Sequence, residues 1–113
     1  MFTGIIKYIK NINWINDNSF YILIDNNTYK LGESIAINGC CLTVDKIIDN
    51  KYYFTLSNKT LEICNFKNIC NIEPALSIND LIGGHIVSGH IDCVGIIKYV
   101  SNSILEIYFD IKF

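Results

Sequence analysis

The chain has 113 residues, half of them hydrophobic, with a formal net charge of −2 at pH 7. This length and composition predict one small globular core. The nine basic residues are all lysines and lie scattered, so no basic stripe favours nucleic acid, and the longest apolar runs are too short to cross a membrane. The N-terminus lacks the charged and apolar regions of a signal peptide. We therefore expect a cytoplasmic protein.

The expected elements are almost all β-strands, because short apolar stretches alternate with polar turn residues. Turn signals occur at Asn16-Asp17-Asn18, Asn38-Gly39 and Asp49-Asn50, residue types that tolerate turn geometry. Pro74 cannot donate to a ladder, so the last strand should end there. The expected strands cover residues 3–12, 19–25, 34–38, 40–48, 51–57 and 69–76.

One short helix is expected over residues 60–64. Thr60 can cap it, and Leu61, Cys64 and Phe66 fall on one side. Six short strands with one helical turn indicate an all-β fold, a closed six-stranded antiparallel Greek-key barrel, because closure also removes exposed sheet edges.

A five-residue sequence occurs twice in the chain. Gly-Ile-Ile-Lys-Tyr stands at residues 4–8 and again at residues 95–99, each time ahead of a β-patterned stretch. Such a repeat indicates a duplicated module, of whose second copy only the first hairpin falls within the chain. We therefore expect a complete unit at residues 1–90 and the start of a second at residues 91–113. An unpaired hairpin at residues 95–110 predicts that two copies associate as a homodimer, or that the hairpin hangs loose.

The five cysteines are odd in number and follow no secretory signal. Free thiols are therefore expected instead of a disulfide framework. Cys40 and Cys41 are adjacent, so in a strand their side chains point to opposite faces. His85 and His90 are spaced five apart, which fits no common metal motif, and no metal site is expected.

Three segments are more specific than the fold requires. They are Met-Phe-Thr-Gly-Ile-Ile at residues 1–6, Asn-Gly-Cys-Cys-Leu-Thr-Val at residues 38–44, and Gly-Gly-His-Ile-Val-Ser-Gly-His-Ile-Asp at residues 83–92. In this order and at these intervals they closely resemble the N-terminal half of riboflavin synthase, and the resemblance extends over essentially the whole chain. That family has two similar six-stranded barrels in tandem, which accounts for the repeat.

The resemblance implies a cofactor-free dismutation, the last step of riboflavin biosynthesis. Two molecules of 6,7-dimethyl-8-ribityllumazine exchange a four-carbon unit, giving riboflavin and 5-amino-6-ribitylamino-pyrimidinedione. Because the 7-methyl anion delocalises into the ring, the enzyme has mainly to hold two rings face to face and move protons. In the family the site forms between unlike barrels of two subunits in a homotrimer. This chain would supply one pteridine half-site.

A lumazine requires an apolar slot with a few convergent donors and acceptors. Backbone groups at residues 4–6 and 41–43 can supply these, and the hydroxyl-bearing stretch 55–60 suits a ribityl chain. The resemblance implies that the candidate catalytic residues are Phe2, Ser34, Cys41 and His90. It implies substrate contacts from Gly4, Ile5, Ile6, Cys41, Leu42, Thr43, Thr55, Leu56, Ser57, Asn58, Lys59, Thr60, Gly89, His90 and Ile91.

Each candidate also has a plain structural interpretation. Thr43 can be an ordinary strand threonine, and Cys41 a small buried hydrophobe. His85 and His90 bracket a glycine-rich turn, where either can cap backbone groups, and Phe2 would ordinarily be a loose terminal residue.

The sequence departs from the family at Lys59, where glutamate is usual, and at Pro74, where a basic residue is common. The second barrel's ligand segment is absent from the chain. Three interpretations follow: a riboflavin synthase, a lumazine- or flavin-binding module without catalysis, and an inactive fragment of the synthase.

Overall fold

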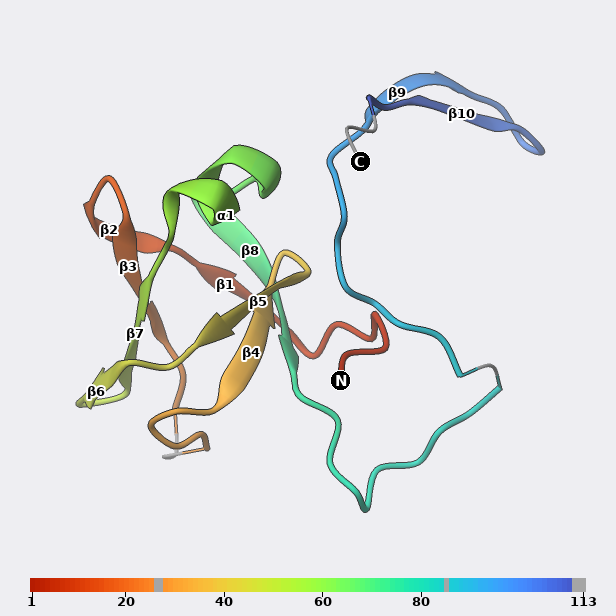
Figure 1. Ribbon diagram of the computed structural model, residues 1–113. Coiled ribbons are helices and arrows are strands. Elements are labelled where there is room, and N and C mark those ends of the chain that lie inside the picture. Colours follow the sequence, from red (N-terminus) through yellow and green to blue (C-terminus); the bar gives the residue numbers. More distant parts are fainter. Residues whose placement is uncertain (26–27, 85, 111–113) are drawn as a thin grey trace.

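The structure is a computed structural model, and it describes residues 1–25, 28–84 and 86–110 (Figure 1). His85, one of the two candidate histidines, lies outside the described residues. No helix in the described ranges is long and apolar enough to pass through a membrane. The elements are β1 (Tyr8–Asn11), β2 (Asn13–Asn16), β3 (Ser19–Leu23), β4 (Ser34–Ile37), β5 (Cys40–Thr43), β6 (Lys46–Ile48), β7 (Lys51–Thr55), α1 (Asn58–Ile63), β8 (Ile69–Pro74), β9 (Ile96–Val100) and β10 (Leu105–Tyr108).

Two four-stranded antiparallel sheets form the main body, in the orders β1-β8-β4-β5 and β2-β3-β7-β6. The chain runs from β1 into β2 through Ile12, and from β5 into β6 through Val44 and Asp45. The Val44 N–H still bonds to the carbonyl of Glu33 beside β4, at 2.9 Å, whereas the Asp45 N–H bonds to Tyr53 on β7, at 3.0 Å. These two bent segments join the sheets at both edges into a six-stranded ring. The expected Greek-key barrel is confirmed.

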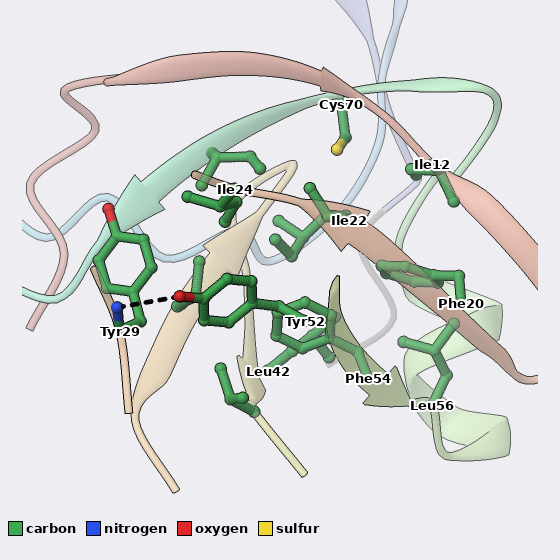
Figure 2. Close-up of a cluster of buried hydrophobic side chains, with 14 residues drawn as sticks. Ile12, Phe20, Ile22, Ile24, Tyr29, Leu42, Tyr52, Phe54, Leu56 and Cys70 are labelled. Atoms are coloured by element: carbon green, nitrogen blue, oxygen red, sulfur yellow. Dashed lines mark hydrogen bonds between the residues drawn. The ribbon is translucent and has the colours of Figure 1, made fainter. Parts of the chain in front are cut away.

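The barrel interior is filled by alternate residues of its strands. Phe20 on β3 lies opposite Phe54 on β7, and Ile22 lies opposite Tyr52; all four side chains are buried. Figure 2 shows the core side chains of both sheets, with Leu42 on β5 and Cys70 on β8 from the other sheet, and the Tyr52 hydroxyl accepting a hydrogen bond from the Tyr29 N–H at 3.4 Å. Because strand side chains alternate between faces, the intervening residues face outward. The core therefore provides a rigid body that presents the outer face for binding.

The turn signals at Asn38-Gly39 and Asp49-Asn50 are confirmed by the backbone. Both residues of each pair have positive φ, 50° and 79° in the first pair and 46° and 64° in the second. Two successive left-handed residues form the tight hairpin turn that matches strand twist, and Asn, Asp and Gly are the residues that adopt it most readily. β8 ends at Pro74, as expected from its missing N–H.

The first strand and the helix begin at other residues than predicted. Pairing with β8 starts at Tyr8, not at residue 3, because the N–H groups of Thr3 and Gly4 bond to a side chain instead. The helix begins at Asn58, and its N-cap is Ser57, whose Oγ accepts the Thr60 N–H at 3.1 Å. Thr60 was expected as the cap, but β7 ends at Thr55 and the helix starts at Asn58, which places Ser57 in the capping position.

The expectation of free thiols throughout is wrong for one pair. Cys40 and Cys64 form a disulfide, with their Cα atoms 6.6 Å apart, while Cys41, Cys70 and Cys93 are free. Counting cysteines could not show this pairing, because it depends on α1 ending beside the start of β5. Cys40 is buried and Cys41 is exposed, which confirms that neighbouring strand residues face opposite ways.

The C-terminal part of the described chain has a different character from the barrel. After β8, residues 75–95 form no helix or strand among those described and pass close to the N-terminus (Figure 1). β9 and β10 then pair with each other antiparallel, and every residue in them is exposed. The second Gly-Ile-Ile-Lys-Tyr sequence thus supplies most of β9.

Candidate functional site

Glu73 anchors the N-terminal segment, residues 1–6, across the outer face of the barrel. Its neighbour Ile72 faces the core, so the pleat directs Glu73 outward, yet the N-terminal segment covers it and leaves it 5% exposed. Its Oε1 accepts the N–H groups of Thr3 and Gly4, at 2.6 and 3.0 Å, and its Oε2 lies 3.1 Å from the Gly4 nitrogen. The carboxylate therefore accepts the backbone N–H groups that would otherwise bond to a neighbouring strand.

Residues 89–91 lie across this segment and join it to the β4–β5 turn. The Gly89 N–H donates to the Phe2 carbonyl at 2.7 Å, and the Ile91 N–H donates to the Gly39 carbonyl at 3.2 Å. A Cβ on Gly89 would overlap the Gly4 backbone, and one on Gly39 would overlap the Ile91 side chain. Only glycine permits both close approaches.

Phe2 is fixed in this arrangement. It is 1% exposed, and its ring packs edge to face against His90, with the ring centroids 5.2 Å apart. The interpretation of Phe2 as a loose terminal residue is therefore excluded. His90 itself is exposed, so its ring has access to solvent as well as to Phe2.

A pocket of about 370 Å³ opens where these segments meet, and we call it the Gly89 pocket. Its size falls within the range of small-molecule sites. Asn38 fixes one wall: its side chain donates to the Asn65 carbonyl at 2.7 Å and accepts the Asn71 N–H at 2.8 Å. The lining residues are Gly4, Ile6, Asn38, Gly39, Cys64, Asn65, Asn71, Glu73, Gly89, Ile91 and Val94.

A second group of candidates lies on the outer face of neighbouring strands. Ser34 on β4 is paired with Thr43 on β5, and Cys41 is two residues before Thr43 on the same exposed face. Beyond Thr43, Asp45 accepts a hydrogen bond from the Thr55 hydroxyl, at 2.6 Å. We call Ser34, Cys41, Thr43 and Thr55 the outer strip. It offers hydroxyl and thiol groups along one surface.

The start of α1 carries the remaining hydroxyl candidates. Ser57 Oγ and Thr60 Oγ1 lie 2.9 Å apart, so each hydroxyl is already partnered but keeps further hydrogen-bonding capacity. Asn58 and Lys59 are exposed in the first turn of the helix. Lys59 lines a groove of about 730 Å³ that also includes Asp92 and Cys93.

Two candidate side chains do not face the outside. Leu42 and Leu56 are buried in the barrel core, as strand alternation requires. The Leu56 N–H already donates to the Asn18 carbonyl, at 2.7 Å. Any ligand contact of these two residues would therefore have to use backbone atoms. Likewise, the Gly4 N–H is occupied by Glu73, which leaves Ile5 and Ile6 as the exposed residues of that segment.

The sequence interpretation missed Glu73 and the side chain of Asn38. A usable signal for Glu73 was a charged residue directly after an apolar strand position, which indicates either an exposed face or a specific partner. For Asn38 the turn signal was recognised, but its two long-range hydrogen bonds depend on the fold. The β4–β5 turn connects the Gly89 pocket to the outer strip, because Gly39 lines the pocket and Cys41 belongs to the strip.

The free cysteines differ in burial. Burial raises the pKa of the Cys70 thiol to about 11, so this core residue stays protonated at neutral pH. Cys41 is the free thiol of the outer strip and is exposed. Among the described residues, no group of three or more His, Cys, Asp or Glu side chains is placed to hold a metal ion.

Comparisons with known proteins relate this geometry to a family. The lumazine binding domain family matches residues 3–75. Riboflavin synthase from Photobacterium phosphoreum is 41% identical over 106 residues, which cover 83% of this chain and 49% of that protein. Riboflavin synthase from Buchnera aphidicola subsp. Schizaphis graminum is 39% identical over 115 residues, covering 89% of this chain and 54% of that protein. The chain thus spans about half the length of the curated relatives it matches.

A solved structure supports the same fold. The crystal structure of LumP complexed with 6,7-dimethyl-8-(1'-D-ribityl) lumazine aligns over 99% of this chain and 69% of its own, with a TM-score of 0.69 and 23% sequence identity. At that identity the likeness concerns the fold alone. The family match covers most of the barrel, from the N-terminal segment to the residue after β8. This chain belongs to the lumazine-binding domain family.

Proposed function

We propose that this chain is a riboflavin synthase unit that supplies one pteridine-binding half-site. The reaction would be the dismutation of two 6,7-dimethyl-8-ribityllumazine molecules to riboflavin and 5-amino-6-ribitylamino-pyrimidinedione. One observation supports this most: the three segments that resemble the synthase, at residues 1–6, 38–44 and 83–92, meet at the Gly89 pocket although they are distant in sequence. The similarity to riboflavin synthases from two species supports it further.

In this proposal the two groups of candidates contact different parts of the substrate. The backbone of residues 4–6 and 89–91 would contact the pteridine edge, where carbonyls and ring nitrogens alternate. Residues 41–43 would contact the same edge through their backbone and the Thr43 hydroxyl, and the hydroxyl-bearing stretch 55–60 would bind the ribityl chain. Phe2, Ser34, Cys41 and His90 would lie nearest the reacting groups. No cofactor is required, because the substrate's own ring delocalises the methyl anion.

We assign residues 1–90 to one lumazine-binding barrel and residues 91–113 to the start of a second. We further propose that the protein acts in the cytoplasm as a homo-oligomer, a homotrimer as in the family or a homodimer of this chain. The exposed residues throughout β9 and β10 support association with a second copy.

The test is to incubate the purified chain with 6,7-dimethyl-8-ribityllumazine and to follow riboflavin by its absorbance and fluorescence. Formation of riboflavin at a rate proportional to protein concentration is the expected result. A parallel titration with riboflavin measures fluorescence quenching on binding. Quenching without turnover would replace the synthase with a non-catalytic lumazine- or flavin-binding module. Absence of both would overturn the proposal in favour of an inactive fragment.

A further inference from the structure

Glu73 is the only charged side chain that is buried among the described residues. A buried carboxylate is costly unless hydrogen bonds compensate it. Here every hydrogen bond to it within the described chain comes from Thr3 and Gly4, namely their two backbone N–H groups and, at 3.4 Å, the Thr3 hydroxyl. Gly4 has a φ of 86°, a conformation that side-chain-bearing residues rarely adopt. Both partners are therefore suited to this interaction, Glu73 by its burial and Gly4 by its backbone conformation.

The anchored segment in turn carries the wall of the Gly89 pocket. The Gly4 backbone lies directly against Gly89, and the Phe2 carbonyl accepts the Gly89 N–H. The Phe2 ring holds His90 by an edge-to-face contact. A shift of residues 2–4 would therefore move residues 89 and 90 with them. Glu73 also lines the Gly89 pocket and a neighbouring groove of about 710 Å³ that includes Ile5 and Ile6.

We propose that Glu73 is a positioning residue for the lumazine site. Its carboxylate holds the N–H groups of Thr3 and Gly4, and through them sets the place of Phe2, of the Ile5 and Ile6 backbone, and of residues 89–91. This inference rests on the proposed function of the Gly89 pocket. Glu73 acts through the N-terminal segment and occupies the Gly4 N–H, so within residues 4–6 the N–H contacts to the pteridine are left to Ile5 and Ile6.

The experiment compares Glu73→Ala and Glu73→Gln with the wild-type chain. Glutamine keeps one acceptor oxygen at the same reach, whereas alanine removes both. Glu106→Gln, an exposed glutamate in β10, is the matched control. Amide hydrogen exchange of Thr3 and Gly4, measured by NMR without ligand, reports the anchoring. Riboflavin fluorescence quenching reports binding, and thermal unfolding reports the fold.

For Glu73→Ala we expect faster exchange of both amides and a dissociation constant for riboflavin raised about tenfold or more. The quenching at saturation should reach the wild-type amplitude, because bound ligand restores the site. Glu73→Gln should recover most of the affinity, and Glu106→Gln should match the wild type. A folded Glu73→Ala variant with unchanged affinity would overturn the proposal, as would unchanged amide exchange.

A further variant covers the case in which alanine prevents folding. Thr3→Pro removes one of the two backbone donors and leaves the side chains of the barrel core in place; we expect weaker riboflavin binding by a chain that still unfolds cooperatively. Unchanged binding by Thr3→Pro would contradict the proposal. Should the wild-type chain bind neither riboflavin nor the lumazine, the proposed function fails and the ligand role of Glu73 fails with it. Amide exchange would still decide the anchoring separately.

Discussion

Two neighbouring residues of β8 serve different purposes on the two faces of the strand. Ile72 and Glu73 are both buried, the first in the barrel core and the second under the N-terminal segment. The hydrophobic effect drives the first burial. Hydrogen bonds from Thr3 and Gly4 compensate the second. Residues with opposite chemistry therefore support the core and the candidate site from one strand.

Thr43 is the outer-strip residue whose hydroxyl is best suited to test ligand contact. It is exposed, and its side chain can be removed without opening the core. We expect Thr43→Ala to weaken riboflavin binding by about 1 kcal/mol, roughly fivefold in dissociation constant, as one hydrogen bond is lost. Fluorescence quenching measures the change. Thr28→Ala, at another exposed threonine, is the control; an equal effect of both variants would remove Thr43 from the site.

At the scale of elements, one five-residue sequence adopts two structures. In the second copy of Gly-Ile-Ile-Lys-Tyr, residues 96–99 belong to β9, the strand that pairs with β10. In the first copy, β1 begins only at Tyr8, and Gly4 is bound to the Glu73 carboxylate. Local propensity is the same in both places, so the surrounding structure decides.

The Cys40–Cys64 disulfide joins two elements of the candidate site, the start of β5 and the end of α1. It closes a loop with a sequence separation of 24. We expect Cys64→Ser to lower the free energy of unfolding by about 3 kcal/mol, because the unfolded chain regains the freedom that the cross-link removed. Urea denaturation with and without dithiothreitol measures it.

Cys93→Ser, at an exposed free cysteine, is the control for that measurement. Dithiothreitol should destabilise this control and the wild type equally and leave Cys64→Ser unchanged. Alkylation of all five cysteines in the unreduced, denatured wild-type chain would contradict the disulfide.

At the scale of the molecule, the barrel buries a core of apolar side chains, whereas the C-terminal hairpin leaves its apolar side chains exposed. The barrel strands bury a cluster that includes Phe20, Tyr52 and Phe54. In the hairpin, Ile96 and Ile97 are 67% and 63% exposed, and no residue of β9 or β10 is buried. A two-stranded hairpin with exposed apolar residues is marginal alone and favours association.

We therefore expect the purified chain to self-associate through the hairpin. Ile97→Lys combined with Ile107→Lys, at paired positions, should shift the population toward monomer, because charges resist burial. Sedimentation velocity over a range of concentrations measures this. Leu31→Lys, at an exposed leucine outside the hairpin, is the control and should leave association unchanged. A wild-type chain that sediments as a monomer at all concentrations would contradict the expectation.

The sequence alone determined what depends on local pattern. Alternation predicted the strands other than β2, Asn38-Gly39 and Asp49-Asn50 predicted their tight turns, and Pro74 predicted the end of β8, because backbone sterics act within a few residues. The resemblance at residues 1–6, 38–44 and 83–92 pointed to the lumazine-binding fold. The individual site residues carried over from it stay predictions for the experiments above.

Tertiary structure decided what depends on residues distant in sequence. Only the fold shows Gly89 against Gly4, Cys40 bonded to Cys64, and the N-terminal segment held by Glu73 instead of by a strand ladder. A hydrogen bond between residues seventy positions apart leaves no periodic signal in the sequence. It arises when barrel closure brings the outer face of β8 beneath the N-terminus, where a buried carboxylate finds backbone donors.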